Sequence, residues 1–223
     1  MKTPFIFRDL LQLKNSREAK KLSLLSGQTK TEKFLLAEIM FNGHERYGKD
    51  LDFCLEENRT DLTVRAKQDE KDERPGKKES GKLIEAVEAK MCYTDCLART
   101  LTGLAGKHEY RDLLLKDRRK LKKAFQNEKC ACLTLILFAI HYDQFPPGFK
   151  YYKSKKYRRQ RDPEKIKAAA LTYVEEAITL KIKPQCFEKE EITPKIEPRC
   201  IEEFDRKLDS GCRLYVFVFR GVG

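Results

Sequence analysis

A carboxylate and an ammonium group stand two residues apart in the apolar segment Leu83–Tyr93, in the triplet Glu88-Ala89-Lys90. In a β-strand every second residue points to the same side, so Glu88 and Lys90 would share one face. Two charges on an otherwise apolar strand cost desolvation free energy unless a partner compensates them. A divalent cation held by Glu88 and a second carboxylate would provide that compensation.

Asp61 is the candidate for the second carboxylate. It heads the preceding apolar segment, Asp61–Ala66, and would meet Glu88 if the two segments pair as neighbouring strands. The polar stretch 67–82 between them does not prevent this pairing, because the entropy cost of closing a loop rises slowly with its length. Two carboxylate ligands completed by backbone carbonyls and water suit Mg²⁺, and Mn²⁺ could substitute for it.

These residues predict chemistry on a phosphodiester bond. A bound metal ion would lower the pKa of its water and stabilise charge on the scissile phosphate. Lys90 could orient that water, help to deprotonate it or screen the developing charge. The triplet alone is weak, because acid-x-lysine also occurs at Glu18, Asp69 and Asp205. Only the triplet at Glu88 lies in an apolar strand pattern behind an acid-headed strand, and the alternative is an exposed ion pair on an edge strand.

The composition favours a polyanionic partner. Forty-seven lysines and arginines against 35 acids give a net charge of +12 and a pI near 9.2. Basic residues cluster in Lys116–Lys123 and in Lys150–Arg161, where tyrosines stand among them. Cations bind phosphates and aromatic rings stack on bases, so both tracts are expected to contact nucleic acid, with a solvated surface as the alternative. The predicted contacts are Lys153, Lys155, Lys156, Tyr157, Arg158, Arg159, Arg161, Arg118 and Arg119.

Cysteine usage and hydropathy indicate a cytoplasmic protein. None of the closely spaced pairs among the eight cysteines has a histidine at zinc-finger spacing, so we expect reduced, mostly buried thiols. No apolar run approaches the roughly 20 residues that a membrane-spanning helix needs. Arg8 and Asp9 interrupt the apolar N-terminus, which is not typical of a signal peptide.

Hydrophobic periodicity predicts the elements that must position these residues. Helices are expected at Arg8–Lys21, Thr31–Arg46, 94–126 and Pro163–Lys181, and strands at Leu51–Glu57, Asp61–Ala66, Leu83–Tyr93, Cys130–His141 and Arg213–Arg220. The strand at Cys130–His141 is expected to be buried on both faces, and residues 182–200 to be irregular. The simplest packing is an α/β (α+β) fold with a mixed central β-sheet flanked by helices.

The chain is expected to divide into an N-terminal helical extension at 1–30, a nuclease-like core at 31–142 and a third part at 143–223. The third part holds the basic and aromatic tract, a helix and a closing strand, and we expect it to pack on the same core.

The run TDLTV, a polar loop and then KLIEAVEAKMCY resemble the core of the PD-(D/E)XK nuclease superfamily, which has the restriction-endonuclease-like fold. The charged helix at Tyr110–Phe125, the apolar strand after it and an upstream helix with an acid, Glu38, are similar to that core too. The resemblance covers about residues 30–142. Thr60 departs from it, because the family has proline at that position, and the loop at 67–82 is longer than usual.

The resemblance implies a Mg²⁺-dependent nuclease in which Asp61 and Glu88 bind metal and Lys90 is the catalytic lysine. Glu38 is a third candidate ligand, although it could equally be a solvated helix acid. DNA is favoured over RNA as substrate, restriction-type cleavage suits the architecture, and a homodimer is open. One alternative is an inactive nuclease-like module that binds nucleic acid or a partner protein. Another is a basic structural protein of a virus or mobile element.

Overall fold

The computed structural model describes residues 31–57, 60–67, 81–94, 116–117, 119–121, 123, 126–127, 130, 132–142, 165, 168, 172, 195–196, 206–208 and 212–222. Its elements are α3 (Glu32–Tyr47), β1 (Leu51–Glu57), β2 (Thr60–Ala66), β3 (Leu83–Tyr93), β4 (Cys132–Tyr142), β5 (Lys195–Ile196), β6 (Arg206–Leu208) and β7 (Cys212–Val222). Helical residues are also described between 116 and 127, and they are called the 116–127 segment below.

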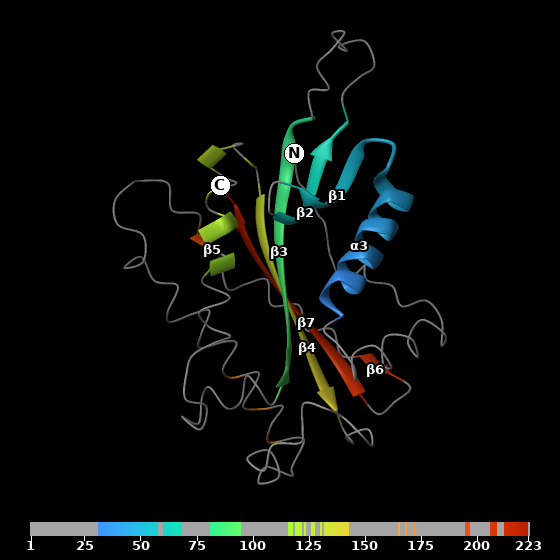
Figure 1. Cartoon of the computed structure of the whole chain (residues 1–223), viewed down its shortest axis with the longest axis vertical. Helices are drawn as coiled ribbons and strands as arrows, with labels where there is room; N and C mark the ends of the chain where they lie inside the picture. The colour runs from blue at the N-terminus through green and yellow to red at the C-terminus, as the bar shows by residue number, and fades with distance from the viewer. Residues whose placement is uncertain are drawn as a thin grey trace.

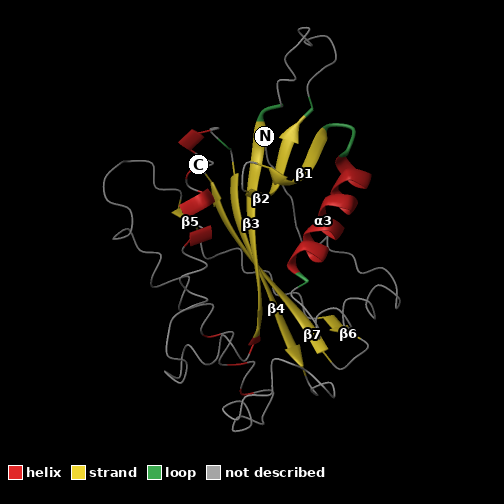
Figure 2. Cartoon of the chain, viewed as in Figure 1, coloured by secondary structure: helices red, strands yellow, loops and turns green. Residues whose placement is uncertain are grey.

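The strands form one mixed sheet in the order β1-β2-β3-β4-β7-β5, with β6 paired to β7 (Figure 1). The first three strands form an antiparallel meander, β4 runs parallel to β3, and β7 runs antiparallel to β4. The return from β3 to a parallel β4 requires a long crossover, and the 116–127 segment lies within it. The predicted mixed sheet with helices is confirmed (Figure 2).

All five predicted strands are present, with ends that move by one or two residues. The prediction that residues 182–200 are irregular is wrong at Lys195–Ile196, which pairs with β7 as β5. The flanking prolines predict an irregular segment, and two residues are too few to show a strand pattern. The strand forms because these two residues pair with the existing edge of β7. The predicted helix at Arg8–Lys21 lies outside the described residues, and so does most of Pro163–Lys181.

One face of the sheet is covered by α3. Its buried residues Leu35, Leu36 and Ile39 recur at helical spacing and pack on alternate residues of the strands. A Cβ atom at Gly43 would lie 2.5 Å from the Phe53 ring, so only glycine permits this close approach of α3 to β1. The core on this face comprises Leu35, Leu36, Ile39, Phe53, Leu62, Val64, Val87, Ala89, Met91, Tyr93, Ile136, Phe138, Ile140, Leu214, Val216 and Val218.

The other face carries Ala86, Glu88 and Lys90 of β3, because residues of even number on that strand alternate with the core residues. Leu121 of the 116–127 segment is buried, and this segment forms ion pairs with β3 on this face. Residues 132–141 of β4 are buried without interruption, as predicted for a strand covered on both sides. Among the described residues, no helix is long and apolar enough to cross a bilayer.

Candidate active site

The candidate site lies where β2 stops pairing with β3. The ladder between the two strands begins at Leu62 opposite Val87, and the same register would set Asp61 opposite Glu88. Instead of continuing the ladder, the Asp61 carboxylate accepts the backbone N–H of Ala89 through Oδ2, at 2.9 Å. Asp61 therefore occupies the point where the β3 edge loses its partner strand. This contact fixes its carboxylate beside Glu88.

Glu32, in the first turn of α3, makes the same kind of contact with the backbone of β3 as Asp61 does. Its Oε2 accepts the backbone N–H of Met91 at 2.7 Å, two residues beyond the N–H that Asp61 accepts. Two carboxylates thus satisfy successive donors that β2 would otherwise have paired. Both carboxylates also line a pocket of about 290 Å³ whose lining residues are Glu32, Lys33, Leu36, Leu55, Glu56 and Asp61. Burial raises the pKa of Glu32, against the effect of the nearby Lys90 ammonium.

Glu88 is the least accessible group of the site, with a side chain that is 0% exposed. Its Oε2 accepts a hydrogen bond from Lys120 at 2.7 Å. Within the described part of the chain, its buried Oε1 has no hydrogen-bond partner. Burial raises the pKa of Glu88 to about 8, and the Asp61 carboxylate adds to this effect while Lys120 opposes it. An orphaned, buried carboxylate oxygen next to a second carboxylate is an unusual arrangement that calls for a ligand.

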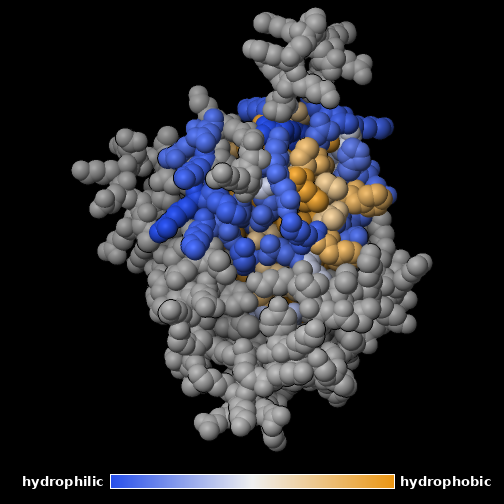
Figure 3. Space-filling model, viewed as in Figure 1, coloured by the Kyte–Doolittle hydropathy of each residue, from blue (hydrophilic) through white to orange (hydrophobic). Residues whose placement is uncertain are grey.

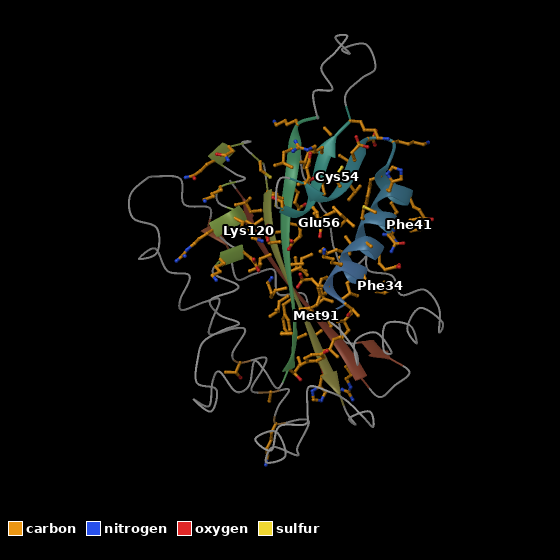
Figure 4. The ribbon with its side chains drawn as sticks, in the orientation of Figure 1. Phe34, Phe41, Cys54, Glu56, Met91 and Lys120 are labelled. Carbon is orange, nitrogen blue, oxygen red and sulfur yellow. The ribbon has the colours of Figure 1, made fainter. Side chains whose placement is uncertain are left out.

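Lys90 and Lys120 are joined by a buried acid of the 116–127 segment. The Asp117 side chain is 5% exposed, and its Oδ2 lies 3.1 Å from the Lys90 ammonium. Its Oδ1 lies 3.4 Å from the ammonium of Lys120, which also contacts Glu88. Lys120 lies on the helical segment beside β3 (Figure 4). Burial acts against the charged form of Lys90, but Glu32 and Asp117 raise its pKa above the ordinary value. The lysine is accordingly held as an ammonium ion.

The burial of the triplet excludes the alternative of an exposed ion pair. Beyond Val87 the β3 edge has lost β2, but the Glu88 side chain is 0% exposed and that of Lys90 is 17% exposed. Glu88 and Lys90 also do not pair with each other in the contacts of the described residues, because each has a partner on the 116–127 segment. These charges are therefore built into the interior face of the sheet.

The structure brings Asp61, Glu88 and Lys90 to one place, as their pattern predicts. Glu38 lies on α3, half-buried and six residues after Glu32, about 9 Å further along the helix axis at 1.5 Å per residue. Of the predicted nucleic-acid contacts, Arg119 is described and exposed. The remaining ones, Arg118 and the residues of the Lys150–Arg161 tract, lie outside the described residues.

Sequence reasoning missed Glu32, Asp117 and Lys120. For Asp117 a signal exists, because it is a lone acid among basic residues and stands four positions before the buried Leu121, on the inward face of a helix. For Glu32 no comparable signal exists, since an acid in the first turn of a helix is a common electrostatic preference. Lys120 could not be separated from its basic neighbours in the sequence.

The donor set suits a hard divalent cation held by few protein ligands. No group of three or more histidine, cysteine or acidic residues in the described part of the chain is arranged to hold a metal ion. Mg²⁺, however, typically keeps several waters and binds through one or two carboxylates together with phosphate oxygens of a substrate. The unpartnered oxygen of Glu88 and the neighbouring Asp61 carboxylate meet that requirement.

Comparison of the chain with family models, with curated proteins and with solved structures found no significant match. The contacts around Glu88 are therefore the basis on which a function is assigned.

Proposed function

We propose that this protein is a Mg²⁺-dependent nuclease that hydrolyses phosphodiester bonds of DNA, with Asp61 and Glu88 as metal ligands and Lys90 as the catalytic lysine. One observation carries the proposal: a wholly buried Glu88 carboxylate with an unpartnered oxygen stands beside a second carboxylate, and the Lys90 ammonium lies on the same face of β3. Burying such a carboxylate lowers the stability of the folded protein, so we attribute its presence to a role in binding or catalysis.

The order of the elements supports the resemblance to PD-(D/E)XK nucleases. An acid stands at the start of β2, a hairpin connection follows, and an acid-x-lysine triplet lies on the apolar strand β3. The charged 116–127 segment and the apolar strand β4 come next, and α3 lies upstream with an acid at the site. In this assignment the helix acid is Glu32 rather than Glu38, because Glu32 contacts β3 next to Asp61.

In the proposed reaction each side chain has a separate task. Bound Mg²⁺ supplies Lewis-acid stabilisation of the scissile phosphate and a water of lowered pKa. Asp61 and Glu88 hold the ion, and the contact of Asp61 with Ala89 keeps its carboxylate in place. Lys90 provides positive charge on the same face of β3 as Glu88 for the phosphate or the attacking water, and Asp117 orients its ammonium.

The surface around the site favours a nucleic acid as substrate. Lys116, Arg119 and Lys123 are exposed on the same segment that carries Asp117 and Lys120. Hydrophilic residues gather on this side of the molecule, whereas apolar ones lie over α3, where Phe41 is 59% exposed (Figure 3). With the net charge of +12, these cations supply sequence-independent affinity for phosphates.

A second function is supported by the ion pair between Lys120 and Glu88. An ammonium ion already neutralises the carboxylate, which suits an inactive nuclease-like module that binds nucleic acid without cutting it. The two functions differ in one respect: the binding module needs no metal ion at Glu88.

Cleavage assays separate the two functions. Duplex DNA, single-stranded DNA and RNA are incubated with wild-type protein in Mg²⁺, in Mn²⁺ and in EDTA, and with Lys90→Ala. We expect cutting that EDTA abolishes and that Lys90→Ala lowers about 10²-fold or more, as for loss of a group acting in the transition state. Lys49→Ala, which removes an exposed lysine from the turn after α3, should cut within about twofold of wild type.

Two results would contradict the nuclease assignment. Wild-type protein that binds these nucleic acids but cuts none of them in either metal ion is the inactive module. Undiminished metal-dependent cutting by Lys90→Ala would instead remove Lys90 from the chemistry while leaving the metal ligands in place.

A further inference from the structure

Lys120 is the one cation in direct contact with Glu88 among the described residues. Its ammonium lies 2.7 Å from Oε2 of Glu88 and 3.4 Å from Oδ1 of Asp117. Neither the acid-x-lysine pattern nor the proposed reaction uses it. Its side chain is 45% exposed, whereas that of Lys90 is 17% exposed. Lys120 can therefore move into solvent, while the carboxylate that it contacts is fixed on a central strand.

A metal ion at Glu88 would face this ammonium at short range. An ion on Oε1, the unpartnered oxygen of Glu88, would lie only one carboxylate group away from the Lys120 ammonium, which contacts Oε2 at 2.7 Å. Two cations at that separation repel each other, and the burial of Glu88 limits the water that can screen them. Binding of the ion and the present position of Lys120 are therefore mutually unfavourable.

The charge balance leads to the same conclusion. Four carboxylates, those of Glu32, Asp61, Glu88 and Asp117, and the two ammonium ions of Lys90 and Lys120 make up the cluster, with a formal charge of −2 when all four carboxylates are ionised. Removing Lys120 makes the cluster more negative by one unit and leaves both oxygens of Glu88 open. The cluster without Lys120 should then attract a divalent cation more strongly.

We propose that Lys120 and a divalent cation compete for Glu88, so that cation binding releases Lys120 toward the exposed basic surface formed by Lys116, Arg119 and Lys123. There its ammonium can contact a backbone phosphate of a nucleic acid. Lys120 is thus a positioning residue that balances the charge of Glu88 before the metal ion arrives. This inference rests on the proposed function, because it requires a cation site at Glu88.

Calorimetric titration with MnCl₂ tests the competition without any need for cleavage. Lys120→Met should bind Mn²⁺ about tenfold more tightly than wild type, within the usual range of coupling between two sites. The matched control is Lys123→Met, which removes an exposed lysine from the same segment and should leave the affinity within about twofold. Glu88→Gln should abolish the binding that the other variants show. Equal affinities of Lys120→Met, Lys123→Met and wild type would overturn the proposal.

A second measurement on the wild-type protein covers the case in which Lys120→Met does not fold. Lysines are acetylated with a water-soluble ester, and the modification of each is read by peptide mass spectrometry with and without MnCl₂. We expect Mn²⁺ to raise modification of Lys120 several-fold relative to Lys123, because a lysine released from its ion pair reacts faster. An unchanged ratio at saturating Mn²⁺ would refute the displacement.

The outcomes separate this inference from the nuclease assignment. Mn²⁺ binding that Lys120→Met does not tighten refutes the role of Lys120 and leaves the nuclease standing. Tightened binding without cleavage of any nucleic acid supports the role of Lys120 and refutes the nuclease. Absence of any Mn²⁺ binding by wild-type protein refutes both.

Discussion

Strand β3 buries two glutamates three residues apart, Glu85 and Glu88, and both are 0% exposed. Glu85 accepts a hydrogen bond from the hydroxyl of Thr134 on the neighbouring strand β4. Glu88 accepts its hydrogen bond from the ammonium of Lys120, and its other oxygen has no partner within the described residues. Burial alone therefore does not distinguish a structural acid from a functional one.

The difference lies in what holds each carboxylate. Thr134 is itself buried on a sheet strand, so its hydroxyl cannot leave Glu85. Lys120 is half-exposed at the end of a long side chain and can leave Glu88. A second acid, Asp61, stands beside Glu88 and makes its charged form harder to keep without a cation. Glu85 is therefore interpreted as part of the sheet, and Glu88 as part of a binding site.

Catalysis gives the largest expected contrast between the two acids. Glu88→Gln should lower Mg²⁺-dependent DNA cleavage about 10³-fold or more, because an amide cannot replace an anionic metal ligand. Glu85→Gln should keep cleavage within about threefold, since residues three apart on a strand point to opposite faces of the sheet. Both variants are compared by initial cleavage rates at matched folded fraction. A similar loss in both would mean that packing of β3, rather than the charge of Glu88, sets the activity.

Stability against pH gives the next contrast, measured in EDTA so that no cation is bound. The pKa of Glu88 rises on folding from its ordinary value of 4.5 to about 8. Between these values the folded protein keeps a proton that the unfolded chain releases, so this group makes stability fall as pH rises. The free energy of unfolding of wild type relative to Glu88→Gln should drop by about 3 kcal/mol between pH 5 and pH 8. Linkage sets an upper limit of about 1.4 kcal/mol for each pH unit in this window, and water that penetrates to the carboxylate lowers the total.

Urea unfolding at several pH values measures this difference. Thr172→Val, which removes an exposed hydroxyl that does not titrate, is the control and should keep the wild-type slope through this window. A wild-type curve that runs parallel to that of Glu88→Gln would show that Glu88 is already ionised in the folded protein, with Lys120 as a sufficient counter-ion.

The sequence predicts much of the fold because the strands carry strong patterns. The apolar run of β4 and the extent of β3 are found in the structure nearly to the residue. Asp61, Glu88 and Lys90 could also be found, because two of them share a face of one strand and the third heads its neighbour. The short strands β5 and β6 could not, since their pairing is determined by the edge of β7 rather than by their own residues.

The rest of the site depends on tertiary contacts that no local pattern contains. Glu32 enters the site because α3 crosses β3 near Met91, where β2 has already ended. Lys120 and Asp117 enter because the crossover between two parallel strands returns over the face that carries Glu88. Hydrophobic periodicity can indicate that Asp117 points inward, but it cannot predict which ammonium ions the Asp117 carboxylate contacts.

The smallest expected effect concerns Glu85, the glutamate that we interpret as part of the sheet. Thr134→Val keeps the side-chain volume but removes the hydroxyl that donates to Glu85, which should lower the free energy of unfolding by about 1–2 kcal/mol. Thr172→Val removes an exposed hydroxyl that donates to the Ala168 carbonyl at 3.0 Å, and it should change stability by less than about 0.5 kcal/mol. Neither variant should alter Mn²⁺ affinity, whereas loss of the donor to Glu88 in Lys120→Met should. If Thr134→Val also changed the Mn²⁺ affinity, the two glutamates would belong to one coupled network, and the distinction between a fixed and a releasable partner would fail.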